Sequence, residues 1–276
     1  MSPTRAIDAW INPNLPYEVQ GVRDVNYLFK GWTERRAKGT TLDEMIEEMD
    51  AAGVEKGILC AGYGEAEDRQ WVVDAINRFP DRLAGSLVVD PRRGMDGLRE
   101  VDRFVNDHKF KMIRFLAFEV QLPYDHAVYY PFYAKAIELD IAVGVNVGIP
   151  GPLVPGKHQH PLALDEVCWF FPELKLVMQH GGEPWADLCV KLMLKWKNLY
   201  YMSSAFAPKH IPKEIIQFAN TRGADKIMFA SDYPLLEFDR CLAEAKELPF
   251  RDEERRDKFL YQNAYRLFFD DARQNA

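Results

Sequence analysis

Eight short apolar runs alternate with helical patterns along the chain, and this alternation constrains the fold more than any other feature. The runs are rich in β-branched residues, and an amphipathic segment of helical length separates most neighbouring runs. They cover residues 6–10, 56–60, 83–89, 111–116, 141–147, 174–179, 199–202 and 226–230. Such alternation is typical of parallel βαβ units, and eight of them predict an α/β fold, the (β/α)8 TIM barrel.

The segments between the runs carry recognisable helix limits, most completely over residues 41–53. Thr41 is an N-cap residue with Glu44 three positions later, and Gly53 is the residue type that commonly follows a helix. The chain has 276 residues, and a TIM barrel typically takes about 250 residues. We therefore expect a single barrel domain over residues 1–276.

Two of the connections that follow the runs are unusually long, at residues 11–40 and 148–161. The second reads GIPGPLVPGKHQHP, in which prolines restrict the backbone. The active sites of TIM barrels are built from loops at the carboxyl ends of the strands. We therefore expect the long loops after strands one and five to form lids or substrate walls.

The charge and hydropathy of the chain exclude several classes of function. The formal net charge is −7 and the cations are scattered, so we expect no nucleic-acid partner. No apolar run reaches the roughly 18 residues that cross a bilayer, so we expect no membrane partner and a cytoplasmic location. The four cysteines form no CxxC pair, which predicts reduced, mostly buried thiols.

Three residues at the ends of the predicted strands carry chemistry that a barrel mouth can use. His180 leaves an apolar run and meets two glycines, and Asp232 follows another run in KIMFASDYP. Arg114 lies inside an apolar run, where an unpaired charge would be costly. It therefore forms either a salt bridge within the barrel or an anchor for an anionic substrate group. We predict that His180, Asp232 and Arg114 are catalytic.

Aromatic and amide side chains near the same strand ends are candidates for substrate binding. Trp10, Tyr63 and Trp185 offer aromatic walls, and Asn12 and Asn146 offer neutral hydrogen-bond donors. We predict that these five residues bind substrate, although each aromatic residue is also compatible with simple packing.

The segments DAAGVEKGIL, LKLVMQHGGEPW, ADKIMFASDYP and NAYRLF together resemble the amidohydrolase-2 branch of the amidohydrolase superfamily. This branch contains aminocarboxymuconate semialdehyde decarboxylase and related aromatic-acid decarboxylases and hydrolases. The resemblance spans the chain and implies a (β/α)8 barrel. In typical members it also implies one divalent metal ion at the barrel mouth.

The chain departs from this family at the metal ligands. The HxH pair after strand one aligns with Trp10 and Asn12, and the strand-five histidine falls near Asn146 or Ile149. Of the family's ligands only Asp232 remains, together with His180, and catalytic zinc normally takes three protein ligands. We therefore expect an atypical member with no cofactor and no metal ligands; any divalent ion would bind through His180 and Asp232.

Three functions fit these residues. The first is a metal-independent hydrolase, in which His180 acts as a general base on water and Asp232 orients its imidazole. The resemblance to metal-poor relatives points to hydrolytic, retro-Claisen cleavage of an aryl β-ketoacyl-CoA. The second is non-oxidative decarboxylation of an aromatic or muconate-type acid, and the third is a catalytically silent barrel that binds a ligand. The expected partner is thus an acyl-CoA or an aromatic acid, and relatives suggest a homodimer.

Overall fold

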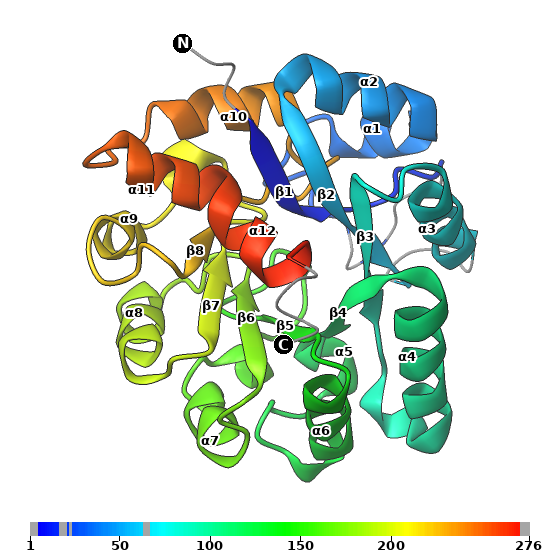
Figure 1. Ribbon diagram of the computed structural model, residues 1–276, viewed down its shortest axis with the longest axis vertical. Helices are drawn as coiled ribbons and strands as arrows, with labels where there is room; N and C mark the ends of the chain where they lie inside the picture. The colour runs from blue at the N-terminus through cyan, green and yellow to red at the C-terminus, as the bar shows by residue number, and fades with distance from the viewer. Residues whose placement is uncertain (1–4, 17–20, 22–23, 63–66, 271–276) are drawn as a thin grey trace.

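The eight apolar runs form one parallel sheet whose strands follow one another in chain order (Figure 1). The computed structural model describes residues 5–16, 21, 24–62 and 67–270. The strands are β1 (Ala6–Ile11), β2 (Val54–Ala61), β3 (Leu83–Val88), β4 (Phe110–Phe115), β5 (Ala142–Asn146), β6 (Lys175–Gln179), β7 (Leu199–Met202) and β8 (Ile227–Met228).

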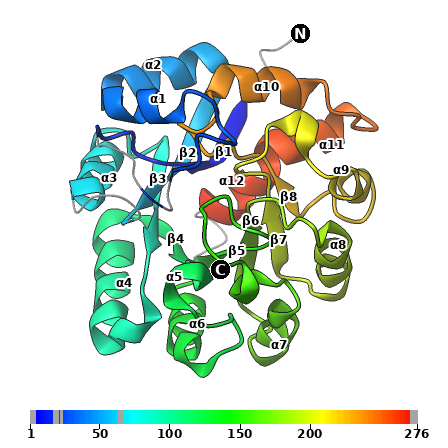
Figure 2. The ribbon, with the colours of Figure 1, turned by 180° about the vertical axis from the view of Figure 1, so that it is seen from behind.

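Helices surround this sheet on its outer side, as Figures 1 and 2 show from opposite directions. They are α1 (Trp32–Lys38), α2 (Leu42–Ala52), α3 (Glu67–Arg78), α4 (Met95–His108), α5 (Ala117–Val120), α6 (Tyr130–Glu138), α7 (Ala163–Phe170), α8 (Ala186–Lys195), α9 (Lys213–Ala219), α10 (Phe238–Lys246), α11 (Glu253–Asp257) and α12 (Asn263–Phe268). Shorter turns are η2 (Pro91–Arg93), η3 (Ala127–Tyr129), η4 (Lys157–Gln159), η5 (Pro208–His210) and the π-helical η6 (Lys258–Gln262). The predicted (β/α)8 barrel is therefore confirmed.

Backbone hydrogen bonds between β1 and the segment after β8 bring the two ends of the sheet together. Ala9 N donates to Phe229 O at 3.0 Å, and Asp232 N donates to Trp10 O at 3.1 Å. The regular β8 covers two residues rather than the predicted 226–230, because the chain beyond Met228 turns to pair with β1. This junction places residues 231–233 beside residues 10–12.

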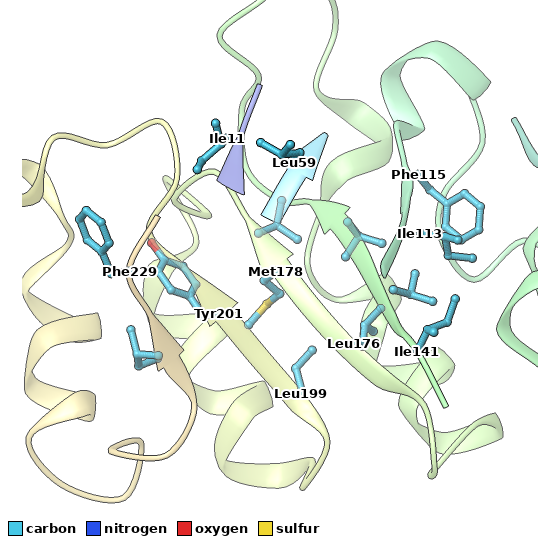
Figure 3. Packing of buried hydrophobic residues seen from close by; sticks show 14 of the residues in the cluster. Ile11, Leu59, Ile113, Phe115, Ile141, Leu176, Met178, Leu199, Tyr201 and Phe229 are labelled. Atoms are coloured by element: carbon cyan, nitrogen blue, oxygen red, sulfur yellow. The ribbon is translucent and has the colours of Figure 1, made fainter. Parts of the chain in front are cut away.

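The alternation of side chains along each strand decides which residues face the barrel interior. In β4, Ile113 and Phe115 pack in the outer cluster between sheet and helices, whereas Met112 belongs to the cluster inside the barrel. Figure 3 shows the outer layer, including Ile113 and Phe115. Arg114 therefore shares the inward face with Met112, and the same alternation in β5 turns Asn146 inward.

The helix α12 closes the amino-terminal end of the barrel. Its residues Leu267 and Phe268 pack with inward-facing strand residues such as Ile7 and Met112. It crosses in front of the strands in Figure 1 and lies behind them in Figure 2. A site can therefore form only at the other end of the barrel, where the carboxyl ends of the strands lie.

Two helices lie where no helix was predicted. The long connection after β1 contains α1, and α5 follows β4 directly. Neither α1 nor α5 has a side-chain cap hydrogen bond at its N-terminus, so the sequence lacks the usual start signal. By contrast, α2 has the predicted capping box between Thr41 and Glu44 and ends at Gly53.

Candidate active site

A cavity of about 800 Å³ opens at the carboxyl ends of the strands. Its inner polar wall consists of Asn12, Arg114, Asn146, His180 and Asp232. The segments around residues 25–30 and 149–152 line its outer part, so the long connections after β1 and β5 form walls of this cavity. Tyr27 Oη donates to Gly151 O at 2.6 Å and links these two segments.

Arg114 is the cation of the inner wall, and it is 3% exposed. Its Nε and Nη2 donate to Asn146 Oδ1 at 3.1 and 2.7 Å, which is a forked contact with one acceptor. Its Cζ lies 4.3 Å from the centre of the Trp10 ring, in cation–π geometry. These contacts fix the guanidinium but place it against neutral groups.

His180 follows β6 directly and contacts Arg114 through Nε2, which lies 2.5 Å from Nη2. Because a guanidinium only donates, Nε2 must be the accepting nitrogen, and Nδ1 then carries the proton. Nδ1 lies 2.9 Å from Ser204 Oγ and 3.8 Å from Asp232 Oδ2. The hydrogen-bond partner of Nδ1 is therefore Ser204, and the Asp232 carboxylate lies beyond hydrogen-bond distance of this nitrogen.

Asp232 lies at the β1–β8 junction and is buried. Its Oδ1 accepts from Asn12 Nδ2 at 2.7 Å, and the same amide donates to Tyr233 O at 3.0 Å. Asn12 therefore ties the carboxylate to the first strand. His180 and Asp232 both have left-handed backbones, with φ of 64° and 66°.

Burial sets the protonation of both groups. Desolvation, with a further contribution from the nearby Arg114 charge, lowers the pKa of His180 well below its ordinary value, so the imidazole is neutral. Desolvation raises the pKa of Asp232 to about 6, although Arg114 and the Asn12 hydrogen bond oppose this shift. The site thus combines a permanent cation, a neutral imidazole and a carboxyl that gains a proton in mildly acidic conditions.

The predicted substrate-binding residues fall in different places. Asn12 and Asn146 line the cavity. Trp10 is fully buried beneath Arg114 and supports the guanidinium instead of walling the cavity. Trp185 packs on His160, with ring centres 4.4 Å apart, and is not among the lining residues. Tyr63 lies outside the described residues.

Two further buried polar residues contact the candidate site or the backbone next to it, and neither was predicted. Ser204 is buried after β7 and bonds the His180 imidazole; the SSAF that follows the seventh run was an available signal. Asp8 is buried in β1 and accepts from the backbone amides of Trp10 and Ser231, each at 3.0 Å. An acid within a strand gave no indication of that partnership, because Ser231 is distant in sequence.

Comparisons relate the chain and its fold to known proteins. The family model described as Amidohydrolase (Amidohydro_2) matches residues 24–269. Searched against curated proteins, the chain has no match. Among solved structures, an uncharacterised TIM-barrel protein from Bordetella bronchiseptica is similar, with a TM-score of 0.78, 22% identity and coverage of 96% of this chain and 98% of its own.

Two similar structures are decarboxylases. A 2,6-dihydroxybenzoate decarboxylase in complex with 2,6-dihydroxybenzoate has a TM-score of 0.72 and 19% identity, covering 96% of this chain and 99% of its own. A 5-carboxyvanillate decarboxylase from Novosphingobium aromaticivorans, in complex with manganese and 4-hydroxy-3-methoxy-5-nitrobenzoic acid, has a TM-score of 0.72 and 17% identity, covering 96% of each chain.

The manganese of the N. aromaticivorans enzyme contradicts our expectation of no cofactor, because it points to a metal ion in enzymes of this fold. Across the ranges that the structure describes, no group of three or more His, Cys, Asp or Glu side chains could hold a metal ion. Arg114 also contacts the Nε2 of His180. The described donors do not fit a catalytic ion with three protein ligands, and no reaction step is assigned to one.

Proposed function

The chain belongs to the amidohydrolase family, and we propose that this enzyme removes the carboxyl group of an aromatic acid as carbon dioxide. Two similar folds belong to decarboxylases that act on a hydroxylated benzoate and on 5-carboxyvanillate. A small aromatic acid is the substrate class that suits the inner wall of the cavity.

No helix within the described ranges is long and apolar enough to cross a membrane.

One observation carries the proposal: Arg114 and a protonatable Asp232 line the inner end of the same cavity. The guanidinium, whose Nε and Nη2 already donate to Asn146 and His180, supplies a fixed positive charge that attracts a substrate carboxylate. A carboxyl whose pKa is raised to about 6 can deliver a proton close to neutral pH. Decarboxylation of an aromatic acid needs these two actions, because a carboxylate leaves as carbon dioxide and a proton replaces it.

The reaction balances with these groups. Asp232 Oδ1 accepts from Asn12, so we place the acidic proton on Oδ2. This proton passes to the ring carbon that bears the carboxylate, and a ring hydroxyl group stabilises the resulting cationic ring. The bond to the carboxylate then breaks, its electron pair restores the aromatic ring, and carbon dioxide leaves. Asp232 remains as a carboxylate and regains a proton from water.

His180 positions the cation in this scheme. Its lone pair on Nε2 accepts from Arg114, and its Nδ1 bonds Ser204. A general base would need that lone pair for water, whereas a neutral orienting group uses it as observed. The arrangement therefore favours decarboxylation over a reaction that begins with water activation by His180.

One observation favours a second candidate, hydrolytic cleavage of an aryl β-keto thioester. The cavity of about 800 Å³ exceeds the needs of a single ring, and the cations Lys30, Arg35 and Arg240 are among its outer lining. A longer, anionic substrate would use that space. In this reaction water adds to the β-keto carbonyl and the carbon–carbon bond breaks, so that its electron pair leaves with the thioester enolate. One proton of the water ends on the enolate carbon, which gives the free thioester, and the other is released to solvent with formation of the aryl carboxylate.

A substrate panel tests the proposal. Purified enzyme, with and without added manganese, is incubated with hydroxylated benzoates and with an aryl β-keto thioester, and carbon dioxide and free thioester products are quantified. We expect carbon dioxide release, and we expect Asp232→Asn to lower kcat by about 10²-fold or more. Asp187→Asn, at an exposed position of α8, is the matched control. Thioester cleavage without carbon dioxide release would refute decarboxylation, whereas full carbon dioxide release by Asp232→Asn would refute Asp232 as the proton donor.

A further inference from the structure

Asp8 is a fully buried acid at the junction where β1 meets the segment after β8. It is 0% exposed, and one oxygen, Oδ1, accepts from Trp10 N and from Ser231 N, each at 3.0 Å. Within the described structure the other oxygen, Oδ2, has no hydrogen-bond partner. One carboxylate oxygen therefore joins β1 to Ser231 in the segment after β8, which is 223 positions away along the chain.

The two amides held by Asp8 flank the candidate site. Trp10 supports the Arg114 guanidinium from below, and Ser231 immediately precedes Asp232. Asp232 has a left-handed backbone with φ of 66°, which a residue with a side chain adopts only when its surroundings impose it. The bond from Ser231 N to Asp8 is one of the contacts that impose it, beside the bond from Asp232 N to Trp10 O.

Packing alone does not explain an acid at this position. Burying a carboxyl with one unpaired oxygen is costly, whereas an apolar side chain would suit the strand interior. Residues that break a local folding rule without an evident gain in stability concentrate at functional sites. Asp8 interacts electrostatically with Asp232 and, on α10, with the Cys241 thiol, and neither group supplies a compensating positive charge.

We infer that Asp8 is a positioning residue, which sets the places of Asp232 and Arg114 by holding the backbone of Ser231 and Trp10. The inference rests on the proposed function for its catalytic consequence, but the backbone contact itself is independent of the reaction. What matters is an acceptor oxygen at this distance, and not the negative charge.

Three substitutions separate geometry from charge. Asp8→Asn keeps an oxygen in place and removes the charge, so we expect kcat within about threefold of wild type. Asp8→Glu keeps the charge and displaces the oxygen, and Asp8→Ala removes the oxygen, so we expect kcat to fall tenfold or more in both. The matched control is Asn263→Ala, which removes two buried hydrogen bonds to backbone oxygens at the other end of β8.

A second measurement does not need activity. Amide hydrogen exchange of peptides covering residues 7–12 and 229–234 should accelerate in Asp8→Glu and Asp8→Ala, but not in Asp8→Asn or Asn263→Ala. If Asp8→Ala does not fold, the comparison of Asp8→Asn with Asp8→Glu tests the inference, because we expect the higher kcat and the slower amide exchange in Asp8→Asn. A fully active Asp8→Glu beside an inactive Asp8→Asn, or unchanged exchange in Asp8→Glu, would overturn the inference. An inactive wild type with the expected exchange pattern would instead refute the proposed decarboxylation alone.

Discussion

His180 and Asp232, two residues of the inner wall of the cavity, share a left-handed backbone conformation. A residue other than glycine in the left-handed region costs of order 1–3 kcal/mol, and both residues adopt it, with φ of 64° and 66°. The surrounding contacts hold them there, through Ser204 for His180 and through Asn12 and the β1 backbone for Asp232. The site is therefore built before substrate arrives, as electrostatic catalysis requires.

The protonation of Asp232 predicts a pH profile. The proton donor is the acid form, which exists below its pKa of about 6. We expect kcat/KM for the aromatic acid to be level below pH 6 and to fall about tenfold per pH unit above it. The measurement is a pH series of initial rates in buffers of constant ionic strength.

The opposite profile would identify a different chemistry. Activity that rises through pH 6 requires an ionised Asp232 and would support base catalysis of water addition. The Asp187→Asn control should reproduce the wild-type profile, because this exposed carboxyl lies outside the cavity lining.

The sequence indicated Arg114, His180 and Asp232 because each interrupts or ends an apolar run, and all three line the cavity. Their catalytic role stays a prediction. Ser204 and Asp8 were missed because their roles depend on residues distant in the chain, His180 and Ser231. Trp185 was expected at the cavity, but it packs on His160 instead. Strand position indicates which end of a barrel a residue occupies, whereas its partners are fixed by turns that sequence patterns do not specify.

At the scale of elements, the connections after β1 and β5 meet over the cavity. Tyr27 Oη donates to Gly151 O at 2.6 Å, and a side chain at Gly151 would contact Val25 and Leu28. The lengths of both loops indicated this role. The helix α1 within the first loop was not predicted, because it begins after Gly31 without a side-chain cap.

The link between these loops predicts an effect on substrate affinity. Tyr27→Phe removes one exposed hydrogen bond but keeps the ring, so the cover over the cavity should loosen while the inner wall stays intact. We expect KM for the aromatic acid to rise about threefold to tenfold, with kcat changed less than twofold, in line with a lost bond of about 0.5–1.5 kcal/mol. Steady-state kinetics at saturating and limiting substrate provide both constants.

Tyr130→Phe is the matched control, because Tyr130 Oη also donates to a backbone oxygen, that of Asp125, but Tyr130 is not among the cavity-lining residues. An equal rise of KM in the two variants would show that the Tyr27 contact has no special relation to the site.

At the scale of the whole molecule, the candidate site and the packing that closes the barrel lie at opposite ends. The carboxyl ends of the strands carry the polar site, and the amino ends are closed by α12. Tyr261 Oη, just before α12, donates to Glu55 at the start of β2, and Asn263 bonds two backbone oxygens near the start of β8. The repeating βα pattern predicted this architecture, but the closing role of the last helix depends on where the chain crosses the barrel axis.

This separation predicts a variant that loses stability and keeps its chemistry. Phe268 is 0% exposed and packs in the cluster inside the barrel. Phe268→Ala should therefore lower the free energy of unfolding by about 3–5 kcal/mol, as measured by urea denaturation. The exposed Phe170→Ala, at 59% exposure, is the matched control and should change it by less than about 1 kcal/mol. Below its unfolding transition, Phe268→Ala should retain the wild-type kcat per folded molecule, because Asp232 and Arg114 lie at the opposite end. A large fall in kcat without loss of stability would instead mean that the closed end of the barrel controls the geometry of the site.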